Sequence, residues 1–314
     1  TQDVATDALA VDLLGPDERG LGNGVQVAGF RLGMMVGGGA LLASFELLGW
    51  PLTFAAVSAL LLLATLPLAC WPLGGLEATS APPLPYRAPA PADASAEESE
   101  TGGEGGENGG LRGFFRRPGV LTWLAFVASF KAFEALGAAM LRPFLVDRGF
   151  RLVEIGWALG TVGSIASLGG ALGGGLLVNR LGRRGALVTF GLAQSACLGA
   201  FGLAAFAGAS RPALIGLCGL EHAAGGMATT ALFTVMMDAC RPKTAATDYT
   251  VQACANVMAT GLASVLSGFV AESVGYGAHF LVAAGLGAFA ALCAGLLRPH
   301  ASWARWSKRS WGAA

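Results

Sequence analysis

The sequence predicts an all-α, polytopic membrane protein on three grounds. Of its 314 residues, 54% are hydrophobic and only 13% are charged, against roughly 25% charged residues in a soluble domain. The mean hydropathy is +0.59. Long apolar runs recur without the period-two alternation of strands, and because a bilayer admits only helices or closed barrels, these runs are expected to be helices.

Three apolar segments come first along the chain. Residues 1–14 would extend only about 21 Å as a helix, which is too short to cross a bilayer. We therefore expect them to be the second half of a helix whose beginning is missing. Residues 21–45 and 51–71 are each long enough to cross.

A polar stretch divides the apolar segments. It is rich in proline, glycine and glutamate and has almost nothing to bury, so it is expected to be a disordered linker. Six further spans are expected after it, at about residues 119–141, 153–178, 185–207, 212–238, 247–270 and 276–297. The predicted domains are an upstream group of helices (1–72), the linker (73–113), a six-helix unit (114–298) and a tail (299–314).

The distribution of lysine and arginine predicts the orientation. Fourteen of the 20 fall on the membrane face that carries the linker and the tail, and four fall on the opposite face. By the positive-inside rule, the first face is cytoplasmic. The expected location is the inner membrane, with several crossings and with the linker and C-terminus in the cytoplasm.

An internal repeat supports this frame. A shift of 226 residues aligns several pairs without a gap: Asp12 with Asp238, Gln26 with Gln252, Gly49 with Gly275, Trp50 with Tyr276, and Phe54 with Phe280. The two copies have the same orientation, as in transporter halves related by an axis along the membrane normal.

A short arginine-rich segment lies between two apolar spans. It reads Gly175-x-Leu177-x-Asn179-Arg180-x-Gly182-Arg183-Arg184. Arginine in hydrocarbon costs about 2.5–3.5 kcal/mol even on a mild scale, so the segment is expected just outside the bilayer. It resembles the loop signature G-x-L-x-D-R-x-G-R-[KR] of the major facilitator superfamily, with Asn179 in place of the usual aspartate. The resemblance implies a gating loop formed by Gly175, Asn179, Arg180, Gly182, Arg183 and Arg184.

Charged residues inside predicted spans are candidates for function, because hydrocarbon tolerates them only when they are paired or face water. We expect substrate binding by Arg31, Lys131, Gln26 and Asn256, and proton coupling by Asp3, Asp7, Glu134 and Glu221. The alternative is structural: Asp7 with Arg31, and Lys131 with Glu134, would neutralise each other, and the amides would join helices. Glu221 has no basic neighbour in its own span except His222, so desolvation should favour its protonated form.

The first forty residues narrow the resemblance. The pattern T-Q-D-x-x-x-D-A, followed by E-R-G-x-G and G-F-R-x-G-M, is similar to the AmpG-like branch of the superfamily. This resemblance implies a major facilitator fold running from a partial helix four to helix twelve, with helices one to three absent. It also implies proton-coupled import of a bulky polar solute, a muropeptide or a siderophore, by alternating access.

Other function classes find less support in the sequence. It contains no GxxxxGK[ST], HExxH, G-x-S-x-G or CxxC pattern, so we expect no enzyme, cofactor or metal site. A formal net charge of zero gives no electrostatic case for nucleic acid. The expected partners are a small-molecule substrate and membrane lipids, and the protein is expected to be a monomer. The alternative function is a polytopic membrane enzyme acting on a lipid or CoA-linked substrate, which would need a Ser or His/Asp constellation near the membrane face.

Overall fold

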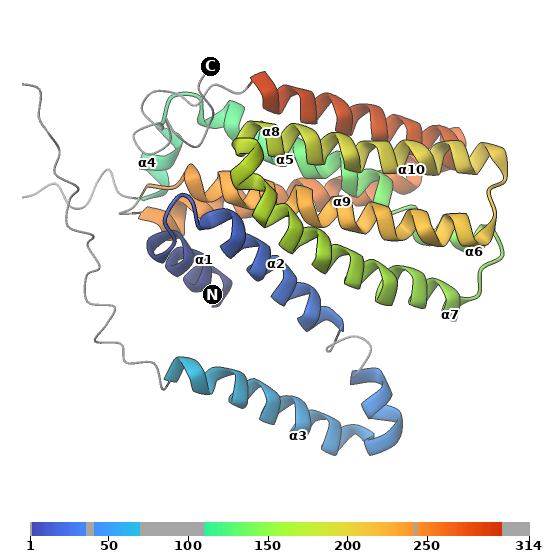
Figure 1. Ribbon diagram of the computed structural model, residues 1–314, viewed down its shortest axis with the longest axis horizontal. Coiled ribbons are helices and arrows are strands. Elements are labelled where there is room, and N and C mark those ends of the chain that lie inside the picture. Colours follow the sequence, from blue (N-terminus) through green and yellow to red (C-terminus); the bar gives the residue numbers. More distant parts are fainter. Residues whose placement is uncertain (1, 36–40, 70–109, 242–243, 297–314) are drawn as a thin grey trace, which may run out of the picture. The chain divides into compact units, whose positions relative to one another are not determined.

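The computed structural model describes residues 2–35, 41–69, 110–241 and 244–296, and almost all of them are helical (Figure 1). The helices are α1 (Gln2–Leu13), α2 (Arg19–Met35), α3 (Leu41–Ala69), α4 (Leu111–Phe115), α5 (Val120–Ala138), α6 (Leu141–Asp147), α7 (Leu152–Ile155), the π-helix η3 (Gly156–Val162), α8 (Gly163–Ala207), α9 (Arg211–Asp238) and α10 (Ala245–Leu296). The all-α prediction is confirmed for these residues.

The predicted linker and tail lie largely outside the described residues. Only the end of the linker is described, and there residues 111–113 begin the short helix α4. Within the described part, four helical runs are long and apolar enough to cross a membrane: Gly49–Leu66, Val120–Asp147, Leu152–Ala207 and Ala245–Leu296. The protein is therefore a multi-pass membrane protein.

Three glycines bend these long helices where the sequence predicts connections. Gly49, Gly182 and Gly275 have φ of 69°, 72° and 75° with ψ of 175°, 164° and 161°. This backbone region is essentially restricted to glycine. The turns at Gly182 and Gly275 divide α8 and α10 into consecutive segments, so each long run contains two of the predicted spans.

The predicted 226-residue repeat recurs in local structure. Gly49 and Gly275 make the same turn, and each is followed by a stacked aromatic pair. The ring centroids are 5.3 Å apart in Trp50–Phe54 and 6.5 Å apart in Tyr276–Phe280. These local features agree with a duplicated helical unit.

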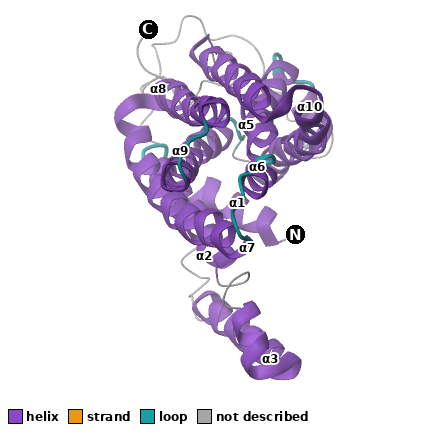
Figure 2. Ribbon diagram, turned by 90° about the vertical axis from the view of Figure 1, so that its right-hand side faces the viewer, coloured by secondary structure: helices purple, strands orange, loops and turns teal. Residues whose placement is uncertain are grey.

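The chain divides into two compact units, and α3 belongs to the second one. In the first, α5, α8, α9 and α10 run side by side, and α2 lies along α8 and α9 (Figures 1 and 2). Local signals position α9: Gly208, with φ of 67°, ends α8, and Pro212 occupies the first turn of α9 after an extended Ser210.

The predicted span 119–141 differs from the structure at its end. The helix breaks after Ala138 and resumes as α6, where a loop was expected. Met140 N–H bonds to the Gly137 carbonyl, which leaves the Leu136 carbonyl for other donors. Ser267 Oγ donates to that carbonyl at 2.5 Å, and His279 Nε2 lies 2.9 Å from it. These two side chains, to which the sequence pattern assigns no role, satisfy a backbone group that the break exposes.

Two apolar clusters form the core of the bundle. One includes Trp123, Phe126, Phe130, Leu187, Phe190, Leu232, Val235 and Met236. The other includes Leu136, Phe144, Leu145, Leu198, Phe201, Leu214 and Phe280. Along α5, the second half of α8, and α9, the stretches between the clusters each carry two polar side chains that contact one another or a neighbouring helix. The packing therefore places a polar layer between two apolar ones.

Candidate functional site

Polar side chains from three helices form this middle layer. They are Lys131 and Glu134 on α5, Gln194 and Ser195 on α8, and Glu221 and His222 on α9. Lys131, Gln194, Ser195 and Glu221 are buried, at 9%, 4%, 6% and 3% exposure. Burying an unpaired charge is costly, so the contacts within the layer decide which side chains are available to bind a solute or to accept a proton.

Lys131 and Glu134 are joined by an ion pair, three residues apart on α5. Helical spacing brings such residues to one face, as the sequence predicts. The Glu134 side chain is 21% exposed and the Lys131 side chain 11%. The pair is therefore neutral as a whole and partly accessible, and a solute with an anionic group would have to compete with Glu134 for Lys131.

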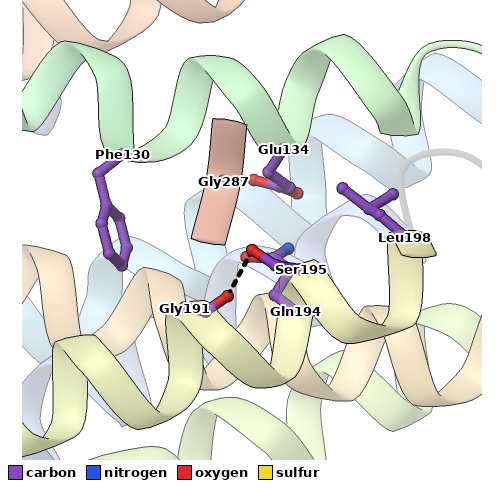
Figure 3. Close-up of a pocket in the computed structure, with 7 residues that line it drawn as sticks. All are labelled: Phe130, Glu134, Gly191, Gln194, Ser195, Leu198 and Gly287. Atoms are coloured by element: carbon purple, nitrogen blue, oxygen red, sulfur yellow. Dashed lines mark hydrogen bonds between the residues drawn. The ribbon is translucent and has the colours of Figure 1, made fainter. Parts of the chain in front are cut away.

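A small cavity adjoins Glu134 (Figure 3). Glu134 points from α5 towards Gln194 and Ser195 on α8, and Ser195 Oγ donates to the Gly191 carbonyl at 2.8 Å. The lining is completed by Phe130, Gly191, Leu198 and Gly287. The cavity has room for about one water molecule, so it suits a water or a proton and not a bulky solute in this arrangement.

Glu221 is held by two neighbours. His222 Nδ1 lies 2.8 Å from its Oε2, and Gln194 Nε2 donates to its Oε1 at 3.5 Å. The sequence singles out Glu221 because its own span offers little to pair with it, but the adjacent histidine is in direct contact. The structure therefore joins Glu221 and His222 in a pair, to which α8 contributes Gln194.

The remaining predicted site residues are placed as follows. Gln26 Nε2 donates to Asp7 Oδ1 at 2.6 Å, so this amide joins α2 to α1. Arg31 is partly buried on α2. Asn256 lies on α10, with its Oδ1 buried and without a hydrogen-bond partner among the described residues. The Asp3 side chain lies outside the described part of the structure.

The arginine-rich segment forms a second polar site, centred on Asp238. Arg183 is buried, and its Nε donates to Asp238 Oδ2 at 2.8 Å. Arg19 NH1 donates to Asp238 Oδ1 at 2.9 Å. One carboxylate at the end of α9 thus joins the start of α2 to the turn of α8. We call Arg19, Arg183 and Asp238 the Asp238 cluster.

Asn179 completes the contacts of this segment. Its Oδ1 accepts a hydrogen bond from Arg183 NH1 at 2.8 Å, and its Nδ2 donates to the Asp17 carbonyl. Arg183 NH2 also donates to the Pro16 carbonyl. An aspartate has no amide to donate to the Asp17 carbonyl, so Asn179 suits this position. Of the other two arginines, Arg180 is exposed and Arg184 is partly buried, which makes Arg183 the central residue of the predicted loop.

Glycines bring α2 and α8 into close contact beside this cluster. A Cβ added at Gly175 would lie 2.6 Å from the Gly20 carbonyl oxygen, and one at Gly24 would lie 2.8 Å from the Ala171 carbonyl oxygen. Farther along α2, a Cβ at Gly29 or Gly33 would meet nothing within 4 Å. The close contact is thus confined to the part of α2 nearest the Asp238 cluster.

Gly175→Ala is expected to lower stability by about 1–3 kcal/mol, because overpacking forces the two helices apart. The full-length protein in detergent should show a lower unfolding temperature. Gly173→Ala is the matched control on the same helix, since nothing lies within 4 Å of its added Cβ. Equal melting of the two variants would contradict the close helix contact.

A third polar group lies near the same end of the bundle. Arg241 Nε and NH2 donate to the two oxygens of Asp248 at 2.9 and 2.7 Å, and Arg117 NH1 lies 3.4 Å from Oδ2. Asp248 is fully buried. Nearby, Gln252 accepts a hydrogen bond from Trp123 at 2.7 Å and donates to the Met236 carbonyl at 3.2 Å. These contacts tie α5, α9 and α10 together.

Several of these residues are absent from the sequence-based site prediction: Arg19, Gln194, Ser195, His222, Asp238 and Asp248. Asp238 had one signal, since it aligns with Asp12 in the repeat. Gln194 and Ser195 could have been noticed in the sequence as adjacent polar residues in an apolar span. Neither signal identifies the partner, because the partners lie far away in the sequence.

Comparison with known proteins gives an independent result. Residues 2–255 match the family described as Major Facilitator Superfamily. The chain is 28% identical over 283 residues to the "Anhydromuropeptide permease" of Escherichia coli (strain K12), covering 90% of this chain and 54% of that protein. It is 26% identical over 283 residues to the "Putative transporter AmpG 4" of Rickettsia conorii, covering 90% of this chain and 65% of that protein. The chain thus spans about half to two thirds of the length of these relatives.

Proposed function

The chain belongs to the Major Facilitator Superfamily, and we propose that it is a proton-coupled secondary importer of a bulky polar solute in the inner membrane. The observation that carries this proposal is the polar layer between two apolar clusters, with an ion pair on α5 and a Glu–His pair on α9. Transporters of this architecture bind solute and coupling ion at the middle of the membrane. We propose a monomer with its Asp238 cluster on the cytoplasmic face.

Roles follow from charge and position. Lys131 and Arg31 would bind anionic groups of the solute, with Gln26 and Asn256 as polar contacts. Glu221 and Glu134 would take up and release the proton, with Asp3 and Asp7 as further candidates. The Asp238 cluster, with the loop residues around Asn179, would close the cytoplasmic side. Because Arg19 and Asp238 lie on α2 and α9, their pairing must break if these helices separate.

A muropeptide is the solute that we propose. The Escherichia coli relative is named a permease for anhydromuropeptide, and that name favours this solute over a siderophore, which rests on sequence resemblance alone. The names of both relatives also favour a transporter over a membrane enzyme acting on a lipid or CoA-linked substrate.

The test is uptake of radiolabelled anhydromuropeptide by proteoliposomes that contain the full-length protein. With an acidic exterior, the label should accumulate inside above its external concentration, and a protonophore should abolish the excess. Accumulation that is insensitive to the protonophore would contradict proton coupling. No uptake of the muropeptide but uptake of a ferric siderophore would instead move the substrate to the second candidate.

A further inference from the structure

On the basis of the proton-coupled function above, we propose that His222 delivers the proton that Glu221 takes up, and that Gly163 leaves room for the His222 ring to lie in position for this step. His222 would be a proton-delivering residue of the site, and Gly163 would position its ring. This role is independent of which solute is carried. Three observations support it: the contacts of Nδ1, the close approach of Gly163 to the Nε2 edge of the ring and the difference in exposure between the two side chains.

The contacts of Nδ1 define the tautomer of the ring. This nitrogen lies 2.8 Å from Glu221 Oε2 and 2.9 Å from the Cys218 carbonyl oxygen. A carbonyl oxygen can only accept a hydrogen bond, so Nδ1 carries the proton in this arrangement. In the neutral ring, Nε2 is then the acceptor and the atom at which an incoming proton would bind.

Gly163 lies directly against that edge of the ring. A Cβ added there would lie 2.8 Å from Nε2 and 2.6 Å from Cδ2 of His222, closer than any real side chain is found. Gly163 directly follows the π-helix η3, a rare type of turn that is frequent at functional sites. The backbone of α8 therefore approaches the ring as closely as only a glycine allows.

The two side chains differ in exposure. The Glu221 side chain is 4% exposed, and that of His222 is 20% exposed. A proton that reaches the carboxylate directly must pass through packed protein, whereas the ring is partly open. The ring is thus the more accessible member of the pair, at which a proton would enter.

The proton passes through the His222 ring in two transfers. A hydronium ion gives a proton to Nε2, which leaves water and an imidazolium with both nitrogens protonated. Nδ1 then passes its proton to Glu221 Oε2, giving a neutral acid and a neutral ring with its proton on Nε2. The N–H bond at Nδ1 breaks as the O–H bond forms. Proton exchange with water restores the first tautomer after Glu221 has released its proton to the other side.

Charges on the neighbouring helices bear on this step. Arg31 on α2 is the charged group that faces the ring from that helix. Lys131 on α5, with its partner Glu134, faces the carboxylate of Glu221. The other titratable groups near the pair are the thiols of Cys197 on α8 and Cys218 on α9.

The first test is His222→Asn in the full-length protein. The asparagine amide can replace Nδ1 as a donor to Glu221 but cannot carry a second proton. Uptake of radiolabelled anhydromuropeptide driven by a pH gradient should fall on the order of 100-fold, the lower end of what a positioned proton-transfer group contributes. Exchange of internal label for external unlabelled solute, which needs no net proton movement, should stay at the wild-type rate.

The second test is Gly163→Ala, with Gly169→Ala as the matched control because its added Cβ would meet nothing within 4 Å. The new methyl group displaces the ring, so proton-driven uptake should fall while exchange continues and the control behaves as wild type. In the His222→Asn background the shorter side chain avoids the clash, and Gly163→Ala should have no further effect. Such non-additivity is expected of residues that act through one contact.

Wild-type proton-driven uptake in His222→Asn would overturn the proposal, because it would show that a donor at Nδ1 is enough. Loss of exchange together with uptake would also overturn it, because it would place His222 in solute binding or packing. Failure of the proposed function looks different. If the proposed function is wrong, Glu221→Gln will itself retain uphill uptake. If only the role of His222 is wrong, Glu221→Gln will lose uphill uptake, and the His222 and Gly163 variants will behave differently from the results expected above.

Discussion

Asp238→Ala is expected to open the loop end of the bundle and to destabilise the protein by about 3–5 kcal/mol. That range is typical of removing one partner from a buried ion pair, which leaves the other charge uncompensated. The Arg183 side chain is only 2% exposed and would keep its charge without the carboxylate at 2.8 Å. Arg19 would lose the same partner, so the link between α2 and α9 would be lost as well.

Cys240 offers a direct measure of this opening. Burial raises the pKa of its thiol, and since the thiolate is the reactive form, alkylation at pH 8 should be slow in the closed arrangement. Exposure to water lowers the pKa towards its ordinary value, so the thiolate fraction and the alkylation rate at pH 8 should both rise. The measurement is the maleimide labelling rate of a variant whose only cysteine is Cys240, together with its unfolding temperature.

Asp17→Ala is the matched control, since it removes an exposed carboxylate from the same region. Its labelling rate and unfolding temperature should stay close to wild type, because exposed ion pairs contribute about 0–1 kcal/mol. If Asp238→Ala labelled and melted like this control, the cluster would not hold the loop end closed.

Glu221→Gln is expected to abolish uphill uptake of radiolabelled anhydromuropeptide by the full-length protein, while exchange across the membrane continues. Glutamine keeps the size of the side chain and can still hydrogen-bond Gln194 and His222, but it cannot release a proton. The expected result is uptake that stops at equal concentrations inside and outside, whatever the pH gradient. The measurement is the final ratio of internal to external label.

Glu272→Gln provides the control, because Glu272 is an exposed carboxylate on α10. It should accumulate the label as the wild type does. Accumulation driven by the pH gradient in Glu221→Gln would show that Glu221 serves only to hydrogen-bond neighbouring helices. Glu134 would then be the next candidate, since it lies in the same polar layer and lines the cavity.

Several expectations followed from residue type alone. Glycine is essentially the only residue that adopts the backbone at Gly49, Gly182 and Gly275, and two of these are partners in the sequence repeat. The spacing of Lys131 and Glu134 predicts their contact, because residues three apart share a helix face. The break after Ala138 was not predictable in this way. It is supported by Ser267 and His279, whose contacts with Leu136 span 131 and 143 residues.

The membrane character, the order of the apolar spans, the arginine-rich connection and the charged residues within the spans could all be predicted from the amino-acid sequence. These follow from local hydropathy and from the cost of charge in hydrocarbon, both of which act along the chain. The contacts of Asp238 could not be predicted in this way, because it joins Arg183, 55 residues away, to Arg19, 219 residues away. The same packing brings Gln194, 27 residues from Glu221 in the sequence, to that carboxylate. Ion pairs and hydrogen bonds need atoms within about 3 Å, and for residues this distant only the packing of the helices brings them so close.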